Sequence, residues 1–114
     1  MKRSKVVLVL LALWLTVSLA QAQGDLRTVR GTVVNKDEAP VASAIVHLKN
    51  SRTMSVRTYI TDASGGYRFS GLDSNVDYEL HAERDNMISN NRTVSSFDSR
   101  KEIVIPLKLD KEKK

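Results

Sequence analysis

The chain contains no cysteine and only two histidines among its 114 residues. Without thiols it can form no disulfide, hold no thiolate-bound zinc and present no cysteine nucleophile. Aromatic residues make up only 5%, and the single tryptophan, Trp14, lies in an N-terminal apolar run. A domain built from the rest of the chain must therefore be held together by packing alone, with few rings for a core or a ligand.

The first 22 residues have the layout of a secretory signal peptide of bacterial type. Lys2, Arg3 and Lys5 form a basic start, and a 15-residue apolar run over 6–20 follows. Such a run is short for a spanning helix, which needs about 20 apolar residues. An uncleaved N-terminal anchor is the alternative, whereas a lipid anchor is excluded because no cysteine follows the run.

Small residues mark the predicted cleavage site at the end of this segment. Ala20 and Ala22 stand where a signal peptidase reads small side chains, so Gln23 is expected to begin the mature chain. We therefore expect a secreted, periplasmic or cell-envelope protein that keeps no membrane span after cleavage.

Export changes the charge of the chain. Three of the 18 basic residues and none of the 13 acidic ones lie in residues 1–22, so the net charge falls from +5 to +2. The remaining arginines are scattered among acidic residues, whereas a nucleic-acid binder shows a clustered basic face. No nucleic-acid partner is expected.

The mature chain alternates between apolar and polar residues. This period of two is typical of strands with one buried face. Tyr67 and Phe69, for example, share one face while Arg68 lies on the other. The pattern predicts about seven strands, over 27–35, 43–49, 56–61, around 67–69, 78–83, 92–96 and 101–109.

Short strands with turn signals every 8–12 residues and no helical segment favour a seven-stranded antiparallel β-sandwich. Pro106 cannot donate to a ladder and suggests an edge position for the last strand. Residues 110–114 read as a charged, disordered tail. The faces predict a core of Val29, Val33, Ala44, Val46, Leu48, Tyr67, Phe69, Leu72, Tyr78, Leu80, Ile103, Ile105 and Leu107.

A turn is predicted between the strands at 56–61 and 67–69. Asp62 can accept hydrogen bonds from the backbone N–H groups just ahead of it. Gly65 or Gly66 can adopt a positive φ without a Cβ clash. We interpret these three residues as a structural turn.

Four motifs in order resemble a carboxypeptidase regulatory-like domain over residues 28–109. They are Gly31-Thr32-Val33-Val34, then Pro40 to Leu48, then Thr61-Asp62-x-x-Gly65-Gly66-Tyr67-x-Phe69-x-x-Leu72, then Tyr78-x-Leu80-x-Ala82. The resemblance implies a transthyretin-like (prealbumin-like) sandwich, grouped with carbohydrate-binding-like folds, and a non-catalytic accessory role. Ala39 replaces a glycine common in the family, and Asn75-Val76-Asp77 replaces its Pro-Gly turn. Residues 23–27 are then a short linker.

The sequence indicates no catalytic, cofactor or metal site. His47 lacks the His-x-x-Glu spacing of a zinc carboxypeptidase. His81 and Glu83 share one strand face, but two ligands are too few for a structural or catalytic zinc site.

These observations predict an exported, non-enzymatic β-sandwich module that acts in protein interaction or as a structural or accessory domain of the cell envelope. Its partner would be an envelope or secreted protein that adds a strand to an edge, at the Pro106 strand or at 86–96. The alternative is a carbohydrate-binding module. Tyr59 and Phe97, the rings left outside the predicted core, would then contact the glycan.

Overall fold

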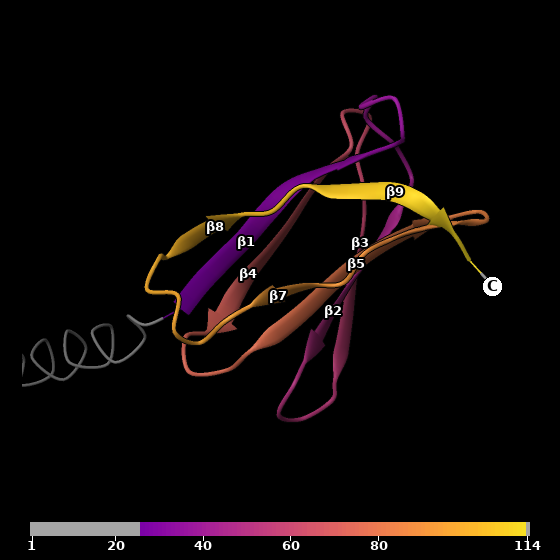
Figure 1. Ribbon diagram of the computed structural model, residues 1–114. Helices are drawn as coiled ribbons and strands as arrows, with labels where there is room; N and C mark the ends of the chain where they lie inside the picture. The colour runs from indigo at the N-terminus through magenta and orange to yellow at the C-terminus, as the bar shows by residue number, and fades with distance from the viewer. Residues whose placement is uncertain (1–25, 114) are drawn as a thin grey trace, which may run out of the picture.

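The computed structural model describes residues 26–113, which form an all-β domain without a helix (Figure 1). The predicted cleavage site at Ala20, Ala22 and Gln23 lies outside the described residues. Within residues 26–113, no helix is long and apolar enough to cross a membrane. The nine strands are β1 (Leu26–Val34), β2 (Ile45–Asn50), β3 (Val56–Ile60), β4 (Gly66–Asp73), β5 (Tyr78–Arg84), β6 (Met87–Ser89), β7 (Arg92–Val94), β8 (Glu102–Val104) and β9 (Leu107–Glu112).

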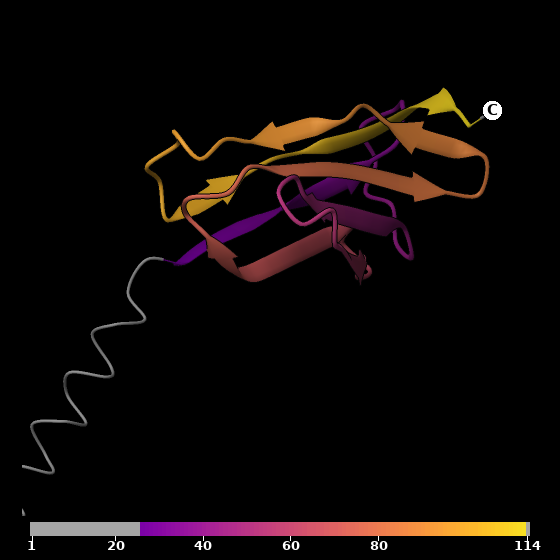
Figure 2. The same ribbon diagram turned by 90° about the horizontal axis from the view of Figure 1, so that it is seen from below.

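The strands form two layers that face each other (Figure 2). One layer has the order β4-β1-β8, and the other has β3-β2-β5-β6, with β7 also beside β5. β9 links the layers, since it pairs with β6 in one and with β1 in the other. No ladder joins β3 to β4, so the sandwich is closed along β9 and open along β3 and β4.

The predicted all-β sandwich is confirmed, but the strand count and directions differ from the prediction. β6 was not predicted and lies before the predicted bend at Asn90–Asn91, and the predicted strand over 101–109 is divided at Ile105–Pro106 into β8 and β9. β8 and β9 also run parallel to β1, so the pairing is not purely antiparallel.

Two predictions for the C-terminal segment are wrong. Pro106 does not mark an edge strand, because β9 lies between β1 and β6; the proline instead interrupts the strand where it passes from one layer to the other. Residues 110–112 are not a disordered tail, because β9 continues to Glu112 and pairs with β6 there.

The core lies between the layers and contains every residue that alternation predicted for it. Phe69, Leu48, Leu72 and Leu80 are among its largest fully buried side chains. Burial of a large apolar side chain contributes about 1.5–3 kcal/mol. Residues beyond the predicted set also join the cluster: Val41, Val76, Ala82, Val94 and Leu109.

The link between β8 and β9 crosses β1 at very short range. A Cβ atom on Gly31 would lie 2.0 Å from the carbonyl oxygen of Ile105, so only glycine fits there. The Ile105 N–H donates to the Arg30 carbonyl at 2.9 Å, and the buried Tyr67 hydroxyl donates to the Ile105 carbonyl at 2.5 Å. Burial raises the pKa of this tyrosine, which keeps its hydroxyl protonated as a donor. These contacts hold the crossing in place.

Arg27 is buried, with only 3% of its surface exposed. Its guanidinium donates to the carbonyl oxygens of Ser95 at 2.7 Å and Val76 at 2.8 Å. It also donates to those of Asp73 at 3.1 Å and Asp98 at 3.4 Å, so it joins the β4–β5 turn to the loop after β7. Its charge predicts a place among the scattered surface arginines, although Arg27 lies two residues before Val29 on the same strand and therefore on the same, buried face.

We expect Gly31→Ala to lower the free energy of unfolding by about 3 kcal/mol, as overpacking does when the backbone must move. Gly71→Ala is the matched control, because Gly71 has a φ of 70° and no atom within 4 Å of an added Cβ. It should cost about 1–2 kcal/mol from backbone strain alone. Urea unfolding of both variants tests this, and equal losses would show that the crossing tolerates a side chain.

Arg27→Met should lower the free energy of unfolding by about 2–4 kcal/mol, because it leaves buried carbonyl groups without a donor. Arg68→Met, at an exposed position on β4, should change it by no more than about 0.5 kcal/mol. Denaturant midpoints for the two variants give the comparison. Similar midpoints would mean that water replaces the guanidinium without loss.

Candidate functional site

β3 is the most exposed element of the domain. It forms a hairpin with β2 at the lower side of Figure 1 and pairs with no other described strand. All five of its residues are exposed, including Val56 at 53% and Ile60 at 58%. A solvent-facing edge of β-branched residues is a template for another strand.

The backbone of β3 has a defined free edge. Thr61 donates its N–H to the Ala44 carbonyl at 2.9 Å, and Asn50 donates to the Ser55 carbonyl at 2.9 Å. Because hydrogen-bonded positions alternate along an antiparallel ladder, the odd-numbered residues of β3 bond to β2. The even-numbered residues therefore direct their N–H and C=O groups away from the sheet. These outward-facing residues are Val56, Thr58 and Ile60.

The odd-numbered side chains of β3 cover the open side of the core. The Tyr59 ring meets the ring of Phe69 edge-on, with centroids 6.0 Å apart. The Arg57 guanidinium lies 5.6 Å from the Phe69 centroid, and its Nη1 donates to the Ser70 carbonyl of β4 at 3.2 Å. These contacts hold β3 against the domain while its outer edge stays free.

The turn between β3 and β4 contains the three predicted turn residues. Asp62 Oδ1 accepts hydrogen bonds from the N–H groups of Ser64 at 3.0 Å and Gly66 at 2.9 Å. The Gly66 bond, followed by the bonds from Ser64, holds the pKa of Asp62 below its ordinary value. Gly65 has a φ of 77°. The Asp62 carboxylate is thus occupied with backbone donors at the end of β3.

The two aromatic residues proposed for a glycan do not come together. Tyr59 pairs with Val46, which in turn pairs with Ala82 near one end of β5. Phe97 is 95% exposed in the loop after β7. The N–H of the preceding residue donates to Asp77 at 2.5 Å, at the other end of β5. The two rings therefore do not line one binding surface.

The two histidines lie opposite each other on the outer face of β2 and β5. The rings of His47 and His81 stack with centroids 4.6 Å apart and planes inclined by 9°. His47 Nε2 lies 3.0 Å from Glu83, whose other oxygen accepts from Lys113 at 2.8 Å. Sequence reasoning missed this pair, because it depends on the register between two strands. Within residues 26–113, no group of three potential ligands is placed to hold a metal ion.

Hydrogen bonds, burial and neighbouring charges set the protonation states of Glu83 and His81. The bond from Lys113, and then the bond from His47, hold the pKa of Glu83 below its ordinary value. Partial burial, and then the charge of His47, lower the pKa of His81. The cluster therefore favours an ionised carboxylate beside a neutral His81.

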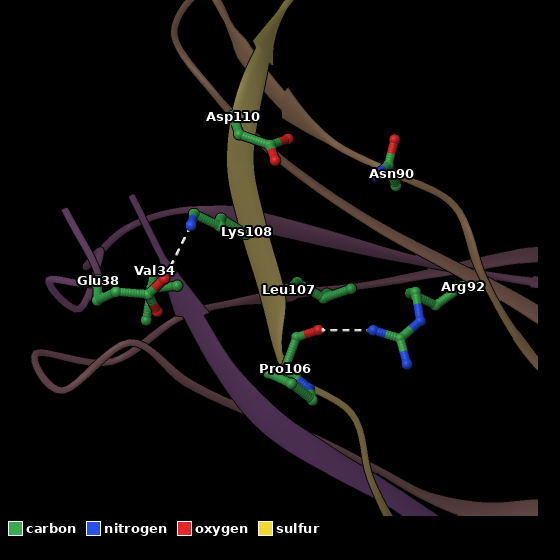
Figure 3. A pocket seen from close by; sticks show the side chains of 8 residues that line it. All are labelled: Val34, Glu38, Asn90, Arg92, Pro106, Leu107, Lys108 and Asp110. Carbon is green, nitrogen blue, oxygen red and sulfur yellow. Dashed lines mark hydrogen bonds and ion pairs between the residues drawn. The ribbon is translucent and has the colours of Figure 1, made fainter. Parts of the chain in front are cut away.

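A hollow of about 240 Å³ lies on the closed side of the sandwich, beside β9 (Figure 3). Lys108 donates to Glu38 across it at 2.8 Å, and this bond raises the pKa of Lys108. Arg92 reaches the Pro106 carbonyl at 3.4 Å. The charged side chains that line the hollow are all exposed, so it lacks the desolvated titratable group that is typical of an active site.

Stability should fall as the pH drops below about 6.5, because His81 binds a proton more readily in the unfolded chain. A second loss should follow below about 4.5, when Glu83 begins to be protonated in the unfolded chain. His81→Gln should flatten the first loss, as measured by urea unfolding at about pH 7.5 and about pH 5.5. Equal stability of the wild-type chain at these two pH values would contradict the assignment.

Solved structures with similar folds include catechol dioxygenases. Catechol 1,2-dioxygenase from Acinetobacter sp. ADP1 is 13% identical, with a TM-score of 0.56, and the match covers 76% of this chain and 53% of that one. The dioxygenase domain of a dioxygenase carbohydrate-binding protein fusion from Streptomyces sp. SirexAA-E is 14% identical, with a TM-score of 0.53 and coverages of 76% and 80%. Chlorocatechol 1,2-dioxygenase from Pseudomonas putida is 10% identical, with a TM-score of 0.56 and coverages of 78% and 61%.

At these identities the likeness concerns the fold alone. The chain also spans only about half of the Acinetobacter enzyme, at 53% of its length. No curated protein sequence matches the chain.

A family model gives the assignment at the level of sequence. The model of the carboxypeptidase regulatory-like domain matches residues 28–108, nearly the whole described part. This match agrees with the four ordered motifs and with the transthyretin-like arrangement of two facing sheets. The chain belongs to the carboxypeptidase regulatory-like domain family.

Proposed function

We propose that the chain is an exported, non-enzymatic module that binds a protein of the cell envelope or a secreted protein in trans. The partner contributes an extended segment that pairs with the free edge of β3. The basic, apolar and small-residue layout of residues 1–22 supports export. The observation that carries the binding proposal is the set of outward-directed N–H and C=O groups on β3, flanked by exposed apolar side chains.

The edge of β3 fits this role better than the edges predicted from sequence. β6 and β9 pair with each other, which occupies most of the segments around Met87 and Pro106. β7 and β8 keep free edges, but each has only three residues. β4 also keeps a free edge, but its ladder with β1 is irregular between Arg27 and Val29 and Gly71 has a φ of 70°, so its edge is a less regular template. β3 offers five residues, and Arg57 and Tyr59 anchor it to the core, so little conformational entropy is lost when a partner strand binds.

Glycan binding is the alternative role. Tyr59 lines a hollow of about 390 Å³ together with Arg30, Thr32 and Arg68, which places an aromatic ring beside hydrogen-bonding groups. A soluble glycan that raises the melting temperature, with loss of the effect in Tyr59→Ala, would favour this alternative over strand addition.

Thr58→Pro should weaken capture of the partner about tenfold, the equivalent of ~1.4 kcal/mol. Proline removes an N–H that points away from β2, so the β2–β3 ladder keeps its bonds. The measurement is capture by the cross-linked full chain from envelope and secreted fractions, quantified for wild type and variant. Melting temperatures verify that both are folded.

Thr93→Pro is the matched control. Thr93 is exposed on β7, and the alternation of the ladder with β5 turns its N–H toward the other free edge of that layer. Capture should survive this change. If Thr93→Pro abolished capture and Thr58→Pro did not, the docking edge would be β7 and the assignment to β3 would be wrong.

A further inference from the structure

The free edge of β3 is self-complementary. Its three outward-facing residues, Val56, Thr58 and Ile60, are evenly spaced about the central threonine. Among residues 26–113, no strand is hydrogen-bonded to this edge of β3, although the side chains of Arg57 and Tyr59 reach across the open side to β4. A second copy of the chain turned by a two-fold axis would present the same groups in the opposite direction, as an antiparallel ladder requires.

Three registers place at least two outward-facing residues of each copy opposite outward-facing residues of the other, with the axis at Arg57, Thr58 or Tyr59. An axis at Arg57 places two arginines opposite each other, which is destabilising for like charges. An axis at Tyr59 overlaps only residues 58–60 of each strand and places Val56 opposite Asp62. An axis at Thr58 overlaps all five residues of β3.

The Thr58 register also gives the best side-chain pairs. On the outer face Val56 lies opposite Ile60 of the second copy, and Thr58 lies opposite its own counterpart. Pairs of β-branched residues of this kind stabilise a sheet. On the inner face Arg57 lies opposite Tyr59 of the second copy, so no like charges are opposed there.

We propose that β3 pairs with β3 of a second copy, antiparallel about an axis through Thr58, to form a dimer. The proposal rests on the proposed function and names the partner as the chain itself. A five-residue edge buries far less than the area of about 1,200 Å² or more in stable interfaces, so the dimer is weak and depends on concentration. The symmetric contact uses both β3 edges and therefore closes at two copies.

The absence of cysteine makes the register directly measurable. Full-length chains with a single substitution, Arg57→Cys, Thr58→Cys or Tyr59→Cys, are oxidised and resolved by non-reducing electrophoresis. Directly opposite residues of a hydrogen-bonded pair have Cα atoms about 5.5 Å apart, within the span of a disulfide. Thr58→Cys should give the largest covalent dimer fraction, and Arg68→Cys, at an exposed position of β4, measures random collision.

A dimer fraction that peaks instead at Arg57→Cys or Tyr59→Cys would overturn the register. Fractions at the level of Arg68→Cys for all three would overturn the dimer itself. The melting temperature of each reduced variant shows that it is folded.

Sedimentation equilibrium tests the same contact without a disulfide. The mean mass of the wild-type chain should rise with concentration, and that of Thr58→Ser should rise in the same way. Thr58→Lys should stay monomeric, because it places like charges across the axis. A wild-type chain that stays monomeric at every concentration would end the proposal.

The outcomes separate this inference from the proposed function. If the chain stays monomeric but captures a different protein, and Thr58→Pro weakens this capture, strand addition to β3 is retained and the second copy is rejected as the partner. Self-association without capture of any other protein would support the dimer and reject a partner other than the chain itself.

Discussion

The close approach of the Ile105 backbone to Gly31 is the constraint on which the rest of the architecture depends. It allows one continuous C-terminal segment to leave the layer of β1 and join the layer of β5, so β9 seals one side of the sandwich. The opposite side has no such strand. Arg57 and Tyr59 cover Phe69 there instead, and the outer backbone of β3 is left without a partner among the described residues. The side closed by β9 and the free edge of β3 therefore lie on opposite sides of the sandwich.

Local alternation predicted the core because burial of one strand face leaves a period of two in the sequence. Tyr67, Phe69, Tyr78 and Leu80 were found in this way, whereas the turn around Asp62 was predicted from its hydrogen-bonding side chain and the two glycines that follow. The features that sequence reasoning missed depend on contacts between distant segments. The stacking of His47 on His81 depends on a register between strands, and the parallel pairing of β1 with β8 depends on topology. Arg27 was missed because charge normally indicates exposure.

The polar groups of the domain are engaged mainly with one another. Arg27 donates hydrogen bonds to backbone carbonyls, and Asp62 accepts them from backbone N–H groups. Glu83 lies between His47 and Lys113 and contacts both. Such pairing stabilises loops and strand ends and leaves the apolar edge of β3 as the most distinctive surface.

The pairing of the first strand with the last ones has a consequence for biosynthesis. Arg30 of β1 and Glu102 of β8 are in contact although 72 positions separate them. Contacts this distant in sequence slow folding, because a long loop must close before they form. The two layers cannot be sealed until residues 102–112 have emerged from the ribosome. Before that point the edge of β1 lacks its partners β8 and β9.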